Sequence, residues 1–180
     1  MHITLRRLDR LPSFRQQLVG KILLGLLREK NDESFQIVHF SIQTNHLHLV
    51  VEANNRAVVR RKMSGFIIAF AKRFNRLLGR RKGKVWDDRY YRRDVKSTRD
   101  MRNVLRYVFG NAKKHGLIPA GAPILDVYST AWLFTEWDRP VAHFVGGEHW
   151  PRPRPRTELL LYACGVEGEL IMTEAPRSSG

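Results

Sequence analysis

The chain has 180 residues, of which 43% are hydrophobic, and this is enough apolar material for the core of one domain of ordinary size. It carries 32 Lys and Arg against 17 Asp and Glu, so its formal net charge is +15. Such an excess argues against a neutral metabolic enzyme and indicates a polyanionic partner, with nucleic acid first and an anionic membrane surface second. Every long apolar stretch is broken by Arg, Lys or Gly, so no membrane span is expected. No signal peptide is found and the single Cys164 cannot form an intramolecular disulfide, which predicts a cytoplasmic protein.

The first alternating segment, residues 2–7, predicts a strand. A complete domain can begin this abruptly, and a missing N-terminal piece is an equally good interpretation. A helix should follow, with Ser13 as its N-cap and Gln16 closing a capping box. Its buried stripe is expected at Phe14, Leu18, Ile22 and Leu26, and its end near residues 30–31.

Two further alternating segments, residues 35–44 and 45–52, predict an antiparallel hairpin because the link between them is very short. In the first strand, Val38, Phe40 and Ile42 should share one face.

The second strand of the hairpin places two histidines side by side. His46 and His48 are two residues apart and therefore point to one face, where their ring nitrogens can converge on a divalent metal. An ordinary amphipathic strand with two exposed histidines fits the same pattern. The pair alone leaves both interpretations open.

A second helix is predicted over residues 56–78, capped by Asn54 or Asn55. Its apolar stripe is Val59, Met63, Phe66, Phe70, Phe74 and Leu77. Basic residues cover the other face and continue into a loop without compensating acids, which favours phosphate contact over simple solvation. The predicted DNA-binding residues of this stretch are Arg60, Arg61, Lys72, Arg73, Arg76, Arg80, Arg81, Lys82 and Lys84.

A fourth strand is predicted over residues 85–95, where aromatic and basic residues interleave. Bases can stack on such aromatic rings while arginines contact phosphates, although a half-buried strand of Tyr and Trp explains the pattern nearly as well. The residues assigned here to DNA binding are Arg89, Tyr90, Arg92 and Arg93, and Trp86 and Tyr91 are the other aromatic residues of this segment.

A last helix should start at the capping-box-like residues 97–100 and end around Gly116. The elements then read β-α-β-β-α-β-α over residues 1–118. This order predicts an α+β fold, with a four-stranded, mainly antiparallel sheet covered by helices.

Residues 119–180 are expected to form an irregular C-terminal extension, partly extended and basic. Residues 151–156 alternate Pro and Arg, which predicts a polyproline-like strap, and a short helix is expected over residues 157–162. Aromatic residues expected to pack back onto the domain are Trp132, Phe134 and Trp137.

Two polar residues of the last predicted helix lie one turn apart. Tyr107 and Asn111 are separated by four residues and share a face that borders the apolar stripe. If that face meets the histidines, the Asn111 amide oxygen supplies a third metal ligand and Tyr107 stands beside a metal-bound phosphate. A buried tyrosine with a hydrogen-bonded hydroxyl is the other interpretation.

The motif His46-Leu47-His48 resembles the His-hydrophobic-His motif of single-tyrosine HUH transposases, the IS200-like family. The segment from Tyr107 to Gly116, where a tyrosine precedes an asparagine by four residues, is similar to the REP-associated branch of that family. The resemblance covers about residues 3–118. Where that branch usually has a proline after the asparagine, this chain has Ala112.

The resemblance implies a DNA transposase that cleaves and rejoins single-stranded or hairpin DNA, with Tyr107 forming a 5′-phosphotyrosine. It also implies a divalent metal, Mg²⁺ or Mn²⁺, held by His46, His48 and Asn111. Neutral imidazoles and an amide suit an anionic substrate, although zinc also fits two histidines. The active unit is a monomer or a homodimer.

Two other classes of function stay open. The first is a module that binds single-stranded or hairpin nucleic acid without cutting it. The second is a metal-dependent hydrolytic nuclease, for which Glu52 is the only acid evident on the histidine face. Tyr90 and Tyr91 are rival nucleophiles, and His115 is explained as a favourable cation at a helix C-terminus.

Overall fold

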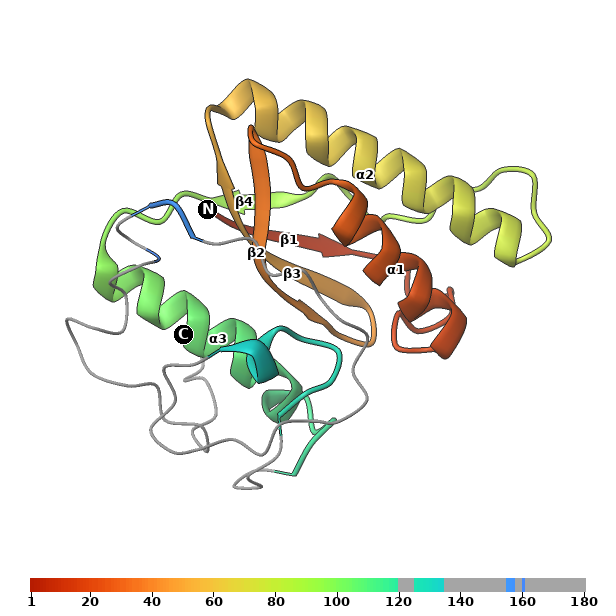
Figure 1. The fold of residues 1–180 in the computed structure, drawn as a ribbon. Coiled ribbons are helices and arrows are strands. Elements are labelled where there is room, and N and C mark those ends of the chain that lie inside the picture. The colour runs from red at the N-terminus through yellow and green to blue at the C-terminus, as the bar shows by residue number, and fades with distance from the viewer. Residues whose placement is uncertain (120–124, 135–154, 158–159, 161–180) are drawn as a thin grey trace.

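The computed structural model describes residues 1–119, 125–134, 155–157 and 160. Its elements are β1 (His2–Arg6), α1 (Gln17–Glu29), β2 (Phe35–Ile42), β3 (His46–Ala53), α2 (Arg56–Leu77), β4 (Tyr91–Arg93), α3 (Thr98–Lys114) and the short 3₁₀ helix η1 (Ala131–Leu133). The strands form one antiparallel sheet in the order β2-β3-β1-β4. Helices α1 and α2 cover one face of this sheet, and α3 covers the other (Figure 1). The predicted α+β fold is confirmed.

Alternate side chains of the central strand β3 point to opposite faces of the sheet and so belong to the two layers of the core. Leu47, Leu49 and Val51 are fully buried against α1 and α2, whereas Val50 packs with α3. His48 is opposite Thr4 of β1 and belongs to the α3 face with Val50. The predicted facing of the histidine strand is therefore confirmed.

Strand β2 does not keep the regular alternation that its sequence predicts. The pairing with β3 shifts between Ile37 and His39, and the irregularity turns Val38 toward the α3 layer while Phe40 stays in the other layer. The prediction that Val38 shares a face with Phe40 and Ile42 is wrong, because a bulge inserts one residue into the period of two.

The caps of α2 and α3 are as predicted. The Asn55 side chain accepts a hydrogen bond from the Val58 N–H, and the Ser97 side chain accepts one from the Asp100 N–H. The C-terminal end of α3 is followed by Gly116, whose φ of 67° is in the left-handed region. In the stripe of α2, Leu77 is the exception because it is 38% exposed.

Helix α1 begins later than predicted. Ser13 accepts a hydrogen bond from the Arg15 N–H within the preceding turn, so it is not the N-cap. The helix starts at Gln17 instead, and its buried residues are Val19, Gly20, Leu23, Leu26 and Leu27. The prediction that Leu18 belongs to the buried stripe is wrong, because this side chain is 58% exposed.

The fourth strand is much shorter than residues 85–95, because only Tyr91–Arg93 pair with β1. Trp86 makes a single bridge with Arg7 and is buried among the rings of the core. Its indole N–H donates to the Ile67 carbonyl at 3.1 Å. Trp86 is therefore a core residue and not a surface ring for base stacking.

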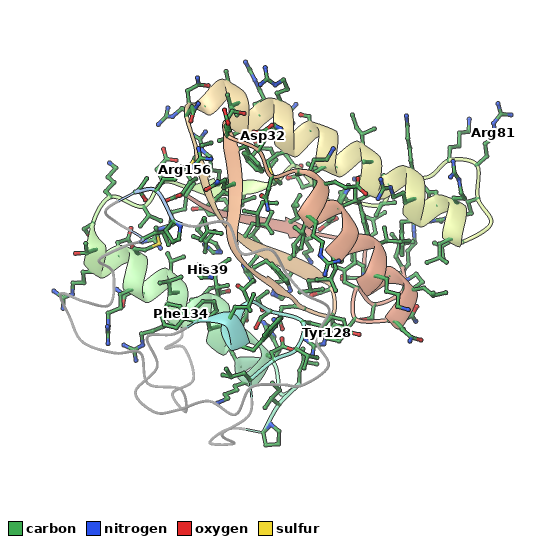
Figure 2. All side chains as sticks on the ribbon, viewed as in Figure 1. Asp32, His39, Arg81, Tyr128, Phe134 and Arg156 are labelled. Carbon is green, nitrogen blue, oxygen red and sulfur yellow. The ribbon has the colours of Figure 1, made fainter. Side chains whose placement is uncertain are left out.

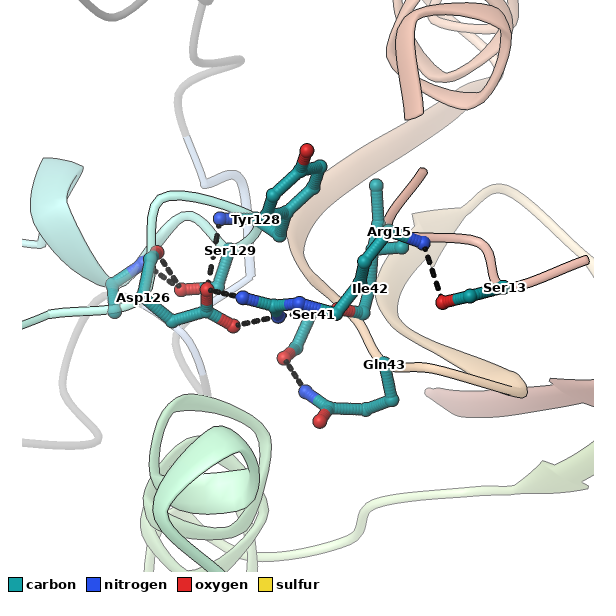
Figure 3. A network of polar contacts seen from close by, with 9 residues as sticks. Ser13, Arg15, Ser41, Ile42, Gln43, Asp126, Tyr128 and Ser129 are labelled. Atoms are coloured by element: carbon teal, nitrogen blue, oxygen red, sulfur yellow. Dashed lines mark hydrogen bonds and ion pairs between the residues drawn. The ribbon is translucent and has the colours of Figure 1, made fainter. Parts of the chain in front are cut away.

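The segment 125–134 is tied to the domain by polar contacts (Figure 3). Asp126 accepts two hydrogen bonds from the Arg15 guanidinium, both at 2.8 Å, and its side chain is 1% exposed. The Tyr128 carbonyl accepts the Ile42 N–H at 2.8 Å. Trp132 and Phe134 pack against the core as predicted, whereas Trp137 lies outside the described residues.

Of the predicted strap and short C-terminal helix, only residues 155–157 and 160 are described. The Glu52 carboxylate accepts the backbone N–H groups of Arg156 and Thr157, each at 2.8 Å. Among the helices of the described ranges, none combines the length and apolar character required to span a bilayer.

Candidate active site

The histidine pair and the tyrosine meet between the sheet and α3. The apolar side chains of α3 pack on Val38 and Val50. This packing positions the Tyr107 side chain against β3. The ring centroids of His48 and Tyr107 are 5.1 Å apart, and those of His46 and His48 are 4.7 Å apart. The predicted convergence of these three residues is what the structure has.

Asn111, one turn beyond Tyr107, is fully buried. Neither its amide oxygen nor its amide nitrogen has a hydrogen-bond partner among the described residues. The Nε2 atom of His48 is buried and unpartnered in the same way. Because buried polar atoms are nearly always satisfied, this group of orphaned atoms is what a missing ligand would leave.

Two imidazoles and an amide oxygen are donor types that bind divalent metals. No group of three or more His, Cys, Asp or Glu side chains in the described ranges is placed to hold a metal. A site here therefore needs a third donor of another type, and the Asn111 oxygen is suitably buried. Glu52 is engaged by backbone amides of residues 156 and 157, so its carboxylate has a structural partner already.

Two residues of β1 that the sequence did not single out support His48. The His48 Nδ1 atom lies 3.1 Å from His2 Nε2 and 3.2 Å from Thr4 Oγ1. A proton on Nδ1 can therefore be donated to either neighbour, which leaves Nε2 as the lone-pair nitrogen that a metal requires. The alternation of β1 puts His2 and Thr4 on one face, but only the register with β3 brings them to His48.

All the imidazoles of the site are held in their neutral form. Burial lowers the pKa of His2 to about 4, with Arg93 adding to the effect, and burial lowers the pKa of His46 to about 4, with His115 adding to it. Burial also places the pKa of His48 well below its ordinary value. Neutral imidazole is the form that binds metals.

The end of α3 adds two basic residues to the site. The His115 ring centroid is 5.1 Å from that of His46, and Lys114 Nζ is 5.3 Å from the Tyr107 ring. His115 is thus a neighbour of the histidine pair, and its interpretation as only a helix-terminal cation is incomplete. Burial raises the pKa of the Tyr107 phenol, and a contact with the Asn111 side chain, which does not meet hydrogen-bond geometry, opposes part of this rise.

A cavity of about 470 Å³ opens beside Tyr107. Strand β4 forms one wall with Tyr91 and Arg93, and α3 contributes Asn103. Arg93 forms an ion pair with Asp100 of α3. Of the residues predicted to bind DNA, Arg93 is the one that the structure brings to the tyrosine.

The basic residues of α2 lie on the other face of the sheet, away from Tyr107 (Figure 1). Arg73 is paired with Glu29 of α1, and Arg80 donates to the Asn75 amide. Arg81 lies at the tip of the loop after α2, far from the α3 layer marked by His39 and Phe134 (Figure 2). The remaining exposed cations of this stretch are Arg61, Lys72, Arg76 and Lys82.

The other predicted DNA-binding residues surround a second hollow, of about 750 Å³, between α2 and the segment 84–92. It is lined by Arg60, Lys84, Arg89, Tyr90 and Arg92, among others.

Comparison with known proteins gives one family and two similar structures. The family described as Transposase IS200 like matches residues 1–111. A REP-associated tyrosine transposase bound to a REP hairpin has the same fold, with a TM-score of 0.52 at 18% identity over 83% of this chain and 90% of that one. A putative transposase from Deinococcus radiodurans matches with a TM-score of 0.44 at 18% identity, over 53% of this chain and 77% of that one. No curated protein sequence matches significantly.

Proposed function

We propose that this chain, which belongs to the IS200-like transposase family, cleaves and rejoins single-stranded DNA. The reaction would proceed through a phosphotyrosine formed by Tyr107. One observation carries the proposal: Tyr107 lies over His48 and one turn from Asn111, and the buried His48 Nε2 and Asn111 amide atoms have no hydrogen-bond partner within the part of the chain that the structure describes. The similar REP-associated transposase was solved with a REP hairpin, which supports a hairpin with single-stranded flanks as the substrate.

In the proposed reaction the Tyr107 oxygen attacks the scissile phosphorus in line. The new bond joins the phenolic oxygen to phosphorus, and the bond from phosphorus to the 3′-oxygen breaks. The phenol loses its proton, the 3′-oxygen leaves as a hydroxyl, and the DNA on the other side stays attached by its 5′-phosphate. Attack by another 3′-hydroxyl reverses the step and restores the tyrosine, so no ATP is consumed.

The residues around Tyr107 prepare this step. Burial raises the pKa of the phenol, so Tyr107 is protonated before the reaction and must lose its proton during the attack. Uncharged His46, His48 and Asn111 add no negative charge that would repel a phosphate. These three side chains would hold Mg²⁺ or Mn²⁺, which when bound polarises the phosphate. His2 and Thr4 hold the His48 ring in place.

The test is a denaturing gel of the protein with single-stranded DNA from its own flanking sequence, labelled at the 5′ or the 3′ end, with and without Mn²⁺. We expect an SDS-resistant adduct that carries the 3′ label, requires metal and is lost in Tyr107→Phe. Tyr91→Phe is the matched control, because Tyr91 lines the same cavity and should leave the adduct intact.

The other outcomes point to other classes of function. Metal-dependent cleavage without an adduct would assign the chain to hydrolytic nucleases. Tight binding with neither cleavage nor adduct would make it a nucleic-acid-binding module.

A further inference from the structure

Resting on the proposed function, we propose that the hollow between α2 and the segment 84–92 binds an unpaired nucleotide next to the cleavage site, with a preference for bases that carry an exocyclic amino group (adenine, cytosine and guanine) over thymine. We call this hollow the β4 groove and define it by Arg60, Lys84, Asp87, Asp88, Arg89 and Tyr90. In this arrangement the DNA strand passes around the edge strand β4, from the groove on one face to Tyr107 on the other.

The two hollows lie on opposite faces of strand β4. Tyr91 pairs with Thr4, and Arg93 pairs with His2, so both side chains share the face of the tyrosine cavity. Arg92 pairs with Ile3, which is buried in the other core layer, and Arg92 lines the β4 groove. Because β4 is an edge strand of three residues, nothing in the sheet lies beyond it to separate the two hollows.

The cations of the β4 groove are available for phosphates. Arg60, Lys84 and Arg89 are exposed, and none of their side chains makes an ion pair within the described residues. By contrast, Arg73, which is on α2 like Arg60, forms an ion pair with Glu29. Three unpaired cations around one hollow favour the binding of a nucleic-acid backbone.

The groove also has a rigid floor and one aromatic wall. Trp86 is 6% exposed, is packed among Phe14 and Phe70, and is fixed by its hydrogen bond to Ile67. Tyr90 is half-buried against the same core and offers a ring on which a base can stack.

Two carboxylates distinguish the groove from a simple phosphate site. Asp87 and Asp88 are exposed in its lining, and one Asp88 oxygen accepts the Arg89 N–H. Carboxylates repel phosphates but accept hydrogen bonds from the amino groups of bases. A base in the groove should therefore point an amino group toward them, which adenine, cytosine and guanine possess and thymine lacks. The whole Watson–Crick edge of a base, with both hydrogens of such an amino group, is free only in unpaired DNA.

The test measures binding in the Tyr107→Phe background by fluorescence anisotropy, with a labelled single-stranded oligonucleotide from the flanking DNA. The double change Arg60→Ala/Arg89→Ala should weaken binding roughly tenfold or more and lower the salt slope by about 1 to 2. The matched control Arg10→Ala/Lys21→Ala removes the same charge from exposed positions that do not line the groove and are not among the predicted DNA-binding residues. Equal weakening by both double variants would overturn the proposal.

Base preference is tested by replacing each nucleotide beside the cut in turn with thymine. One position should lose affinity severalfold, and Asp87→Asn/Asp88→Asn should abolish that difference. Absence of any such position would overturn the base preference. Since these measurements use Tyr107→Phe, they do not depend on the adduct, whose absence in the wild type would instead refute the proposed function.

Discussion

His2 Nε2 lies 3.1 Å from His48 Nδ1, with the two rings stacked at a centroid distance of 5.2 Å. The contact joins the second residue of the chain to the proposed metal ligand. It can fix which His48 nitrogen carries the proton, and this makes His2 a positioning residue.

Replacing His2 tests that role. His2→Phe keeps a stacked ring but removes the acceptor, and we expect Mn²⁺ affinity to fall about 10-fold to 100-fold. The measurement is Mn²⁺ titration followed by electron paramagnetic resonance. His2→Gln retains a side-chain acceptor and should recover part of the affinity. Equal affinity in wild type and His2→Phe would leave Thr4 as the sufficient partner of His48.

Replacing Asn111 with an apolar residue should make the metal-free protein more stable and abolish its activity. Replacing its unpartnered amide with the apolar side chain in Asn111→Leu removes a buried polar group, so the metal-free protein should gain about 1 to 3 kcal/mol of unfolding free energy. Metal-dependent cleavage should be lost. Urea denaturation in EDTA measures the first effect, and the labelled-DNA gel measures the second.

Asn75→Leu is the matched control for that change. Asn75 is also a buried helical asparagine, but its amide donates to the Gly83 carbonyl and accepts from Arg80. Losing these bonds should destabilise the protein. A similar loss of stability in Asn111→Leu would show that the Asn111 amide is satisfied in the metal-free protein.

The metal-free protein should become less stable in mild acid. Burial lowers the pKa of His2 and of His46 to about 4 from the ordinary 6.5, so between these values the unfolded chain binds more protons. The unfolding free energy should therefore fall as the pH drops through this range. Between about pH 7 and pH 5 the loss should be up to about 2 kcal/mol for each imidazole.

Urea melts in EDTA across this pH range measure the effect. Since His2→Phe lacks one of the titrating imidazoles, its stability should depend less steeply on pH than that of the wild type. Parallel curves for the two proteins would contradict the assignment of the acid sensitivity to His2.

The pair of Arg15 and Asp126 should be important for stability. Removing the nearly buried carboxylate in Asp126→Ala leaves Arg15 unpaired and frees the Tyr128 N–H, which Asp126 also accepts. We expect a loss of about 3 kcal/mol or more in thermal or urea denaturation. Glu29→Ala, which breaks the exposed pair with Arg73, should cost less than about 1 kcal/mol. Equal losses would contradict the role of burial.

The parts of the fold that depend on local pattern could be predicted from the sequence. The alternation around His46 and His48, the Asn55 cap and the Gly116 helix end all depend on neighbours within a few residues. The bulge beside Val38 could not be predicted, because it is set by packing against α3 and not by residue order.

Some relationships in the candidate site could likewise be predicted from local sequence, and others depend on long-range pairing. Tyr107 and Asn111 share a face by helix geometry, and this could be predicted before the structure was known. The contribution of His2 could not, since it depends on the register of β1 against a strand more than forty residues later. The separation of the α2 arginines from Tyr107 is likewise a matter of which face of the sheet each helix covers.

The hydrogen bonds between segment 128–130 and β2 bear on how this sheet meets other molecules. Ile42 and Phe40 on the outer edge of β2 make backbone hydrogen bonds with Tyr128 and Thr130, so the C-terminal end of this edge is occupied by the protein's own chain. The opposite edge is short and carries Arg92 and Arg93. Open, uncharged edges are where sheets of separate molecules join and aggregate. Arg92 and Arg93 are paired with Asp94 and Asp100, so this edge consists of three residues whose charged side chains are held by neighbours. The sheet therefore offers little open backbone on which a strand of another molecule could pair.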